Sequence, residues 1–171
     1  MKLTIPQVNV LDEAAFVARF GAVFEHSPWV ARDAWKAAHP FRDPAHLTAA
    51  MQAAVRRADA AAQLALIRAH PDLVGRAARE GTLAPASASE QAGAGLDRLD
   101  PAEAAWFQEQ NDAYRARFGF PFIICVRANR KEAIRAGFLA RQNHSAEAEM
   151  RTALDEIDRI AAFRLGDLVE A

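Results

Sequence analysis

The chain is poor in cysteine and has no long apolar run, and both features restrict the classes of protein to which it can belong. Cys125 is the single cysteine among 171 residues, so an intramolecular disulfide is excluded and a reducing, cytoplasmic environment is expected. No stretch approaches the ~20 apolar residues of a membrane span. Residues 1–6 lack the apolar core of a signal peptide, and residues 168–171 are not the Ser-Lys-Leu peroxisomal signal. We therefore expect a soluble intracellular protein without a membrane partner.

The chain also lacks an excess of either charge. It has 21 Lys and Arg against 22 Asp and Glu, a net charge of −1, so no basic surface for nucleic acid is expected. The histidines, at positions 26, 39, 46, 70 and 144, lack the spacing of metal ligands, and Cys125 has no neighbouring cysteine. Gly-x-Gly-x-x-Gly, P-loop and Gly-x-Ser-x-Gly patterns are absent. The sequence therefore predicts a site with neither a metal nor a cofactor.

What the chain does have is alanine. Hydrophobic residues make up 51% of the sequence, and alanine is nearly half of them. Alanine has the highest intrinsic helix propensity, so this composition favours helix throughout. The length fits one domain with a buried core. We predict an all-α fold, a single domain over residues 1–171 that forms a bundle of about seven to nine helices.

Capping residues and prolines mark where these helices are expected to begin. Asp12 is expected to cap a helix that carries Phe16, Phe20 and Phe24 on its apolar face. The other predicted helix starts are Ser27-Pro28, Asp43-Pro44, Asp59, the capping box Asp100-Pro101-x-Glu103, and Ser145. The helix from Asp59 should end near Ala69, because Pro71 prevents its continuation.

Two segments do not follow the helical pattern. Residues 74–86 contain glycine and proline and are predicted to be irregular. Residues 120–126 are a short apolar run that periodicity alone cannot assign to a strand or a buried helix. A single strand cannot form a sheet, so we expect one buried, irregular apolar segment here, with helix resuming near Lys131.

His70 is the first candidate for chemistry. It lies at a predicted helix end before a proline, where an imidazole commonly interacts with the last carbonyls of the helix. A histidine beside an irregular segment can also transfer a proton near neutral pH. Both interpretations remain open, and we favour the second because a carboxylate motif follows about one helix length later.

That motif is Ser87-Ala88-Ser89-Glu90-Gln91. Its pattern fits a capping box, in which Ser87 caps a helix and Glu90 reaches back to the backbone. A helix N-terminus also offers free N–H groups to an anionic ligand, and the amide of Gln91 can both donate and accept hydrogen bonds, as a ureido group requires. Capping and binding are compatible.

Arg164 is a third candidate, on the last predicted helix among apolar residues. Its side chain either extends to solvent or faces inward as a cation that grips a carboxylate with two parallel hydrogen bonds. The sequence favours neither. Asp72 and Arg127 pose the same choice, and we expect both to be structural.

Several motifs in this order and spacing resemble the OHCU decarboxylase family. They are His70-Pro71-Asp72-Leu73, Ser87 to Gln91, Phe118 to Ile124, Phe24 to Val30, Asn111 with Tyr114, Arg141, and Arg164-Leu165. The resemblance covers nearly the whole chain. It implies an all-helical, often dimeric enzyme, so a homodimer is expected. It also implies a small-molecule substrate, 2-oxo-4-hydroxy-4-carboxy-5-ureidoimidazoline (OHCU), decarboxylated without a cofactor to (S)-allantoin in urate breakdown.

The resemblance also implies which residues act. The catalytic histidine, glutamate and arginine of the family correspond to His70, Glu90 and Arg164. The implied substrate contacts are Pro71, Ser87, Ala88, Ser89, Gln91, Phe122, Ile123, Ile124, Cys125 and Val126. Two alternatives remain open: a non-catalytic helical domain that binds ureido-heterocycles such as allantoin, and a decarboxylase of a related ureido-heterocycle.

Overall fold

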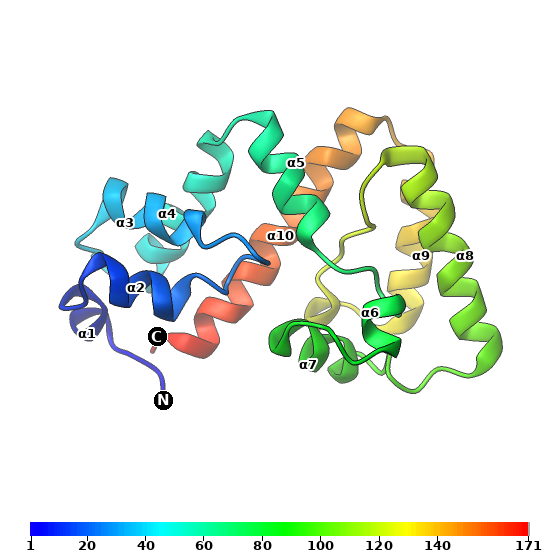
Figure 1. The fold of residues 1–171 in the computed structure, drawn as a ribbon, viewed down its shortest axis with the longest axis horizontal. Coiled ribbons are helices and arrows are strands. Elements are labelled where there is room, and N and C mark those ends of the chain that lie inside the picture. Colours follow the sequence, from blue (N-terminus) through cyan, green and yellow to red (C-terminus); the bar gives the residue numbers. More distant parts are fainter. Residues whose placement is uncertain (171) are drawn as a thin grey trace. The chain divides into compact units, whose positions relative to one another are not determined.

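The computed structural model describes residues 1–170, without the side chains of residues 77 and 79. The predicted all-α fold is confirmed: the described chain contains ten α-helices, one 3-10 helix and no named strand (Figure 1). The helices are α1 (Ile5–Asn9), α2 (Glu13–Phe20), α3 (Trp29–Ala38), α4 (Pro44–Arg57), α5 (Ala60–Ala69), α6 (Arg76–Arg79), α7 (Pro85–Gly93), α8 (Pro101–Phe118), η1 (Val126–Ala128), α9 (Lys131–Arg141) and α10 (Ala146–Leu168).

Two of these helices, α1 and α6, were not expected from the sequence. They have five and four residues, too few for an apolar period to show in the sequence. Helix α6 lies in the stretch 74–86 that was predicted to be irregular. The expected domain of residues 1–171 extends one residue beyond the described chain.

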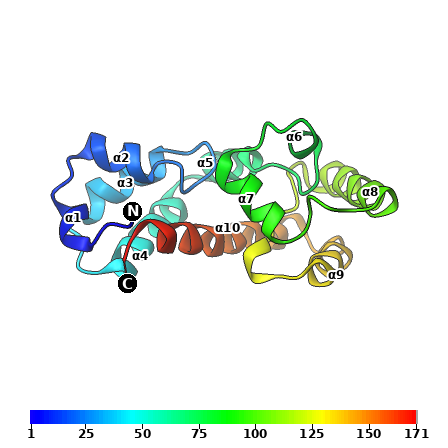
Figure 2. The same cartoon turned by 90° about the horizontal axis from the view of Figure 1, so that it is seen from below.

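The chain forms two compact units. The first comprises residues 1–69 and the residues from 158 onward. In it α3 packs against α2 and α4, around a cluster in which the ring centroids of Phe16 and Phe20 lie 4.7 Å apart. The N-terminal segment pairs with the end of α10, where Leu3 N donates to Leu168 O at 2.9 Å and Glu170 N to Leu3 O at 2.9 Å (Figure 2).

The second unit comprises residues 70–157. Helices α8 and α9 lie side by side in it, joined by aromatic contacts of Phe138 with Phe107 and Tyr114 (Figure 1). Residues 121–125 are neither helix nor strand, and Phe122 stacks on Phe138 with centroids 3.8 Å apart. The prediction of a buried, irregular apolar segment is thus confirmed, and helix resumes at Lys131 as expected.

Most of the predicted helix caps are correct. The carboxylates of Asp12, Asp43 and Asp100 each accept a hydrogen bond from the backbone N–H three residues on, and the Ser145 hydroxyl does the same. The cap predicted at Ser27 is wrong. Pro28 takes the N-cap position of α3, and the Ser27 hydroxyl donates instead to the Glu25 carbonyl at 2.9 Å.

Within residues 1–170, no helix has both the length and the hydropathy to cross a membrane.

Candidate active site

His70 follows the last residue of α5 and is 6% exposed. Pro71 after it prevents further helix, as expected, and the chain turns at once. The turn is tight: a Cβ on Gly75 would lie 2.7 Å from the Asp72 Cβ, so only glycine fits there. The imidazole is therefore carried at the junction of a helix and a compact turn, Asp72–Gly75.

This turn contains a strained residue. Val74 has φ +55°, in the left-handed region that a β-branched residue rarely adopts. The Gln91 side chain holds it there, since its Oε1 accepts from Val74 N at 3.0 Å and its Nε2 donates to Asp72 O at 3.4 Å. One amide thus bridges the turn beside His70 to helix α7.

Helix α8 holds the same turn at two further points. Asn111 Nδ2 donates to Leu73 O at 2.8 Å, from a side chain that is 1% exposed. Arg115 Nε donates to both carboxylate oxygens of Asp72, at 2.9 and 3.0 Å. Asp72 thus forms an ion pair with Arg115, and the turn is held by both α7 and α8.

Ser87 and Glu90 do not form the predicted capping box. Helix α7 begins two residues earlier at Pro85, its N-cap is Ala84, and no side chain caps it. Ser87 is buried at 5% exposure and Glu90 is half-buried, while Ala88 and Ser89 are exposed. Ser87 and Glu90 therefore do not cap α7.

The C-terminal end of the segment Phe122–Val126 lies beside the same helix, because α7 packs against η1, which begins at Val126. Burial raises the pKa of the Cys125 thiol, and the negative charges of Glu156 and Glu90 raise it further.

Two backbone groups of this segment already have protein partners. Arg141 Nη1 donates to Ile123 O at 2.7 Å, and Cys125 N donates to Glu156 Oε2 at 2.7 Å. These two groups therefore need no ligand to complete their hydrogen bonding. Side chains from α9 and α10 instead fix the segment in place.

Arg164 lies in the first unit, on α10, and its side chain faces inward. It is 6% exposed, and its Nη1 donates to Val23 O and to Glu25 Oε2, both at 3.1 Å. Glu25 is itself 3% exposed, so the two form a buried ion pair. Of the two interpretations from the sequence, extension to solvent is excluded.

The second unit therefore brings together His70, α7 with Glu90 and Gln91, and the Cys125–Val126 end of the apolar segment. Arg164 belongs to the first unit. No three His, Cys, Asp or Glu side chains among the residues described are grouped to hold a metal ion.

Sequence reasoning missed the buried carboxylates of Glu149, Glu156 and Glu25, and helix periodicity contains the signal for them. On α10 the buried residues Glu149, Ala153, Glu156, Ile160 and Arg164 follow one another at intervals of three or four residues. They share one face, so three charged residues occupy positions where the pattern demands apolar ones. Charges in such a stripe are candidates for buried networks. Glu25, inside the apolar stretch around Phe24, gives the same signal.

The fold and these contacts define an all-α protein in which titratable side chains gather around a buried, strained turn. The sequence model of the OHCU decarboxylase family matches residues 9–166. The chain belongs to this family.

Individual relatives agree. The chain is 45% identical to the 2-oxo-4-hydroxy-4-carboxy-5-ureidoimidazoline decarboxylase of Haloferax volcanii, over 97% of this chain and 96% of that protein. It is 38% identical to the decarboxylase of the same name from Amia calva, over 96% and 93%. Among solved structures, an (S)-allantoin synthase superposes with a TM-score of 0.79 at 30% identity, over 98% of this chain and 54% of the other. The crystal structure of an OHCU decarboxylase in the presence of (S)-allantoin shares the fold, with a TM-score of 0.67 at 17% identity over 92% and 97%.

Proposed function

We propose that this chain is an OHCU decarboxylase, a carboxy-lyase that produces (S)-allantoin in urate degradation. Membership of the family and near full-length similarity to decarboxylases of that name support the activity. The family model runs through both compact units, which supports a single functional domain over residues 1–171.

One observation supports the site more than any other. Gln91 hydrogen-bonds the turn next to His70 and lies on the helix that carries Glu90. An imidazole and a carboxylate that are distant in sequence are thereby tied to one small region. A positioned pair of this kind is what general acid–base catalysis requires.

In the proposed reaction the bond between the substrate carbon and its carboxylate breaks and carbon dioxide leaves. The ring C=N of the substrate accepts the electron pair, so the decarboxylated carbon, which keeps its hydroxyl group, becomes part of an enol. One proton is then delivered to one face of the neighbouring ring carbon that carries the ureido group, while the hydroxyl proton passes to the ring nitrogen and leaves the carbonyl group of allantoin. His70 handles this proton transfer, oriented with the help of Glu90, and Arg164 positions an anionic or carbonyl group of the substrate. The substrate itself receives the electrons, so we propose that no cofactor takes part.

Substrate contacts are proposed from Pro71, from Ser87 to Gln91, and from the backbone of Phe122 to Val126. The packing of α7 on η1 supports grouping the last two sets. The Gln91 amide contacts the turn through both its oxygen and its nitrogen, so we propose that it orients His70 in addition to binding substrate.

We propose that the protein acts in the cytoplasm. A buried, unpaired Cys125 supports a reducing cytoplasmic environment. We also propose a homodimer, which the resemblance of the motifs to a family that is often dimeric supports.

The test is a coupled assay with urate oxidase and hydroxyisourate hydrolase, which generate OHCU in place. Added protein should speed the loss of OHCU absorbance and give optically active allantoin, and His70→Asn should abolish most of this effect while remaining folded. Unchanged decay to racemic allantoin would contradict the proposal. Binding of allantoin in calorimetry without turnover would instead indicate a non-catalytic binding domain. Turnover of another ureido-heterocycle in preference to OHCU would indicate a related decarboxylase.

A further inference from the structure

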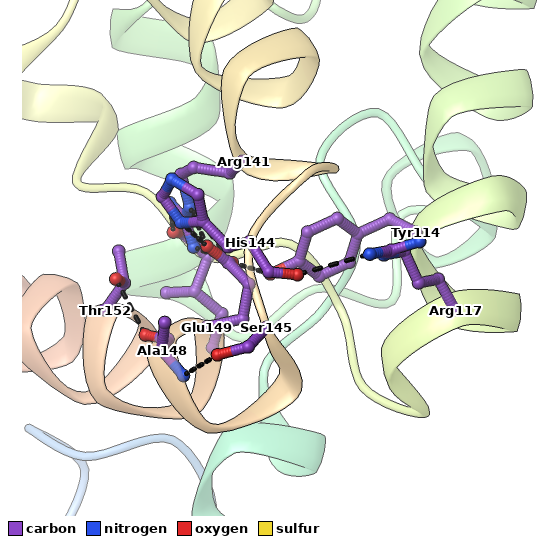
Figure 3. Close-up of polar contacts among 9 residues, drawn as sticks. Tyr114, Arg117, Arg141, His144, Ser145, Ala148, Glu149 and Thr152 are labelled. Carbon is purple, nitrogen blue, oxygen red and sulfur yellow. Dashed lines mark hydrogen bonds and ion pairs between the residues drawn. The ribbon is translucent and has the colours of Figure 1, made fainter.

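A buried carboxylate in the second unit has no place yet in the proposed site. Glu149, in the first turn of α10, is fully buried. Its carboxylate accepts hydrogen bonds from the Tyr114 hydroxyl, from Arg141 Nε and Nη2, and contacts His144 Nδ1 at 2.8 Å (Figure 3). A fully buried carboxylate is costly unless it is paired in this way, so the cluster is a built arrangement.

Arg141 connects this cluster to the apolar segment. Two of its nitrogens bind Glu149, and the third, Nη1, donates to Ile123 O at 2.7 Å. The guanidinium also lies over the Phe122 ring, 4.3 Å from its centroid. Because the guanidinium is planar and rigid, fixing one edge of it on Glu149 fixes the direction in which the other edge points.

A second acidic residue of α10 holds the segment directly. Glu156 lies seven residues after Glu149 on the same helix face, and its Oε2 accepts from Cys125 N at 2.7 Å. The segment is thus held by two hydrogen bonds, one from Arg141 to the Ile123 carbonyl and one from the Cys125 N–H to Glu156. Ile124 lies between these two anchored residues.

We propose that Glu149 and Arg141 are positioning residues for substrate binding: they set the backbone of residues 123–125, against which the substrate is bound. This inference rests on the proposed function. His70 and Glu90 are carried by other elements, and the turn after His70 is held by Gln91, Asn111 and Arg115. Disturbing the Glu149–Arg141 pair should therefore displace the binding segment and leave the proton-transfer groups in place.

The test is the separation of KM from kcat in Arg141→Lys and Glu149→Gln. Lysine retains the charge but cannot span Glu149 and Ile123 O with a planar fork, and glutamine retains the shape of Glu149 but not its charge. Each variant should raise KM about tenfold or more with kcat within about threefold, the pattern of lost uniform binding. The affinity for (S)-allantoin, measured by calorimetry, should fall by a similar factor.

Arg135→Lys is the matched control, because Arg135 is on the same helix but lies over the Trp106 ring, 4.5 Å from its centroid. It should leave KM unchanged. Should the two main variants fail to fold, Tyr114→Phe removes one donor to Glu149 and keeps the aromatic packing, and it should raise KM alone by a smaller factor.

The outcomes separate the two claims. An inactive wild-type protein would contradict the proposed function. An active wild type with an unchanged KM in the folded variants, or with kcat lowered as much as kcat/KM, would overturn the positioning role of Glu149 and Arg141 alone.

Discussion

Glu90 is the sixth residue of α7, too far along the helix for its carboxylate to cap the N-terminus. Replacing it with glutamine keeps its size and hydrogen-bonding reach but removes its charge. We predict that Glu90→Gln lowers kcat by roughly 10²-fold or more, the usual scale for a positioned acid–base group, with almost no change in the melting temperature. Steady-state kinetics and thermal denaturation measure the two effects.

Glu109→Gln is the matched control, because it makes the same change at an exposed position on α8, outside the proposed site. It should leave melting temperature and kcat near their wild-type values. A Glu90→Gln protein that melts early and retains its activity would show that the carboxylate is structural.

Tyr114 is the single tyrosine of the chain, so its ionisation can be followed by absorbance without interference from another phenol. Burial raises its pKa above the ordinary value of 10.0, and the hydrogen bond to Glu149 raises it further, against the opposing charge of Arg141. In the unfolded chain the same group would ionise near 10. Its contribution to stability is therefore fully present below pH 10 and is lost as the pH rises toward the folded-state pKa.

We predict that no tyrosinate absorbance appears in the folded protein at pH 10, and that it appears only together with unfolding at higher pH. Urea denaturation at increasing pH should show a steeper alkaline loss of stability in the wild type than in Tyr114→Phe. Tyrosinate formed at pH 10 in a folded protein would contradict the buried network.

At the scale of elements, α8 has the most complete set of end signals. Asp100 and Glu103 form a reciprocal capping box at its start, and Gly119 adopts the left-handed conformation at its end, φ +75°. Asp100→Ala should lower the free energy of unfolding by about 1 kcal/mol, because it removes the hydrogen bond to the Glu103 N–H. Asp97→Ala, at an exposed pair with Arg98, should change it by less than about 0.5 kcal/mol in urea denaturation. Equal effects would contradict the capping role.

The starts of helices that have an aspartate before a proline were predictable, because the short carboxylate and the fixed φ of proline both act on the nearest backbone. Two of the three serine motifs, at Ser27 and Ser87, misled for a physical reason, whereas Ser145 does cap its helix. A hydroxyl is a weaker cap with other partners within reach: Ser27 donates to the Glu25 carbonyl, and Ser87 lies inside a helix already started by Pro85. Local sequence could not reveal this competition.

At the scale of the whole molecule, the all-α fold and the apolar segment followed from composition, punctuation and periodicity. The hydrogen bonds that hold the candidate site in place could not be predicted in this way. Asn111 and Arg115 reach back 38 and 43 residues to Leu73 and Asp72, and no periodicity relates positions so far apart in the chain. The motif that contains Gln91 was visible in the sequence. The hydrogen bond between its side chain and Val74 N was not, because that bond forms only when α7 packs beside the turn in the folded chain.

The reactivity of Cys125 can be used to detect opening of the second unit. In the folded protein this residue is 1% exposed and burial raises the pKa of its thiol. We predict that a thiol reagent modifies the native protein slowly and the urea-unfolded protein quickly, since only an exposed thiolate reacts. Leu139→Cys, at a position that is 57% exposed, supplies a fast-reacting control in the same unit. Rapid modification of the native wild type would show that the Cys125 segment is open in solution.

The turn after His70 has a consequence for how the protein is made. Its strained residue, Val74, is held by a side chain 17 residues further on, and the rest of the turn by Asn111 and Arg115. A left-handed valine does not persist without such support. On a ribosome, the histidine and its turn therefore emerge long before the residues that shape them, and we expect the nascent chain to order this region only after Arg115 has left the exit tunnel.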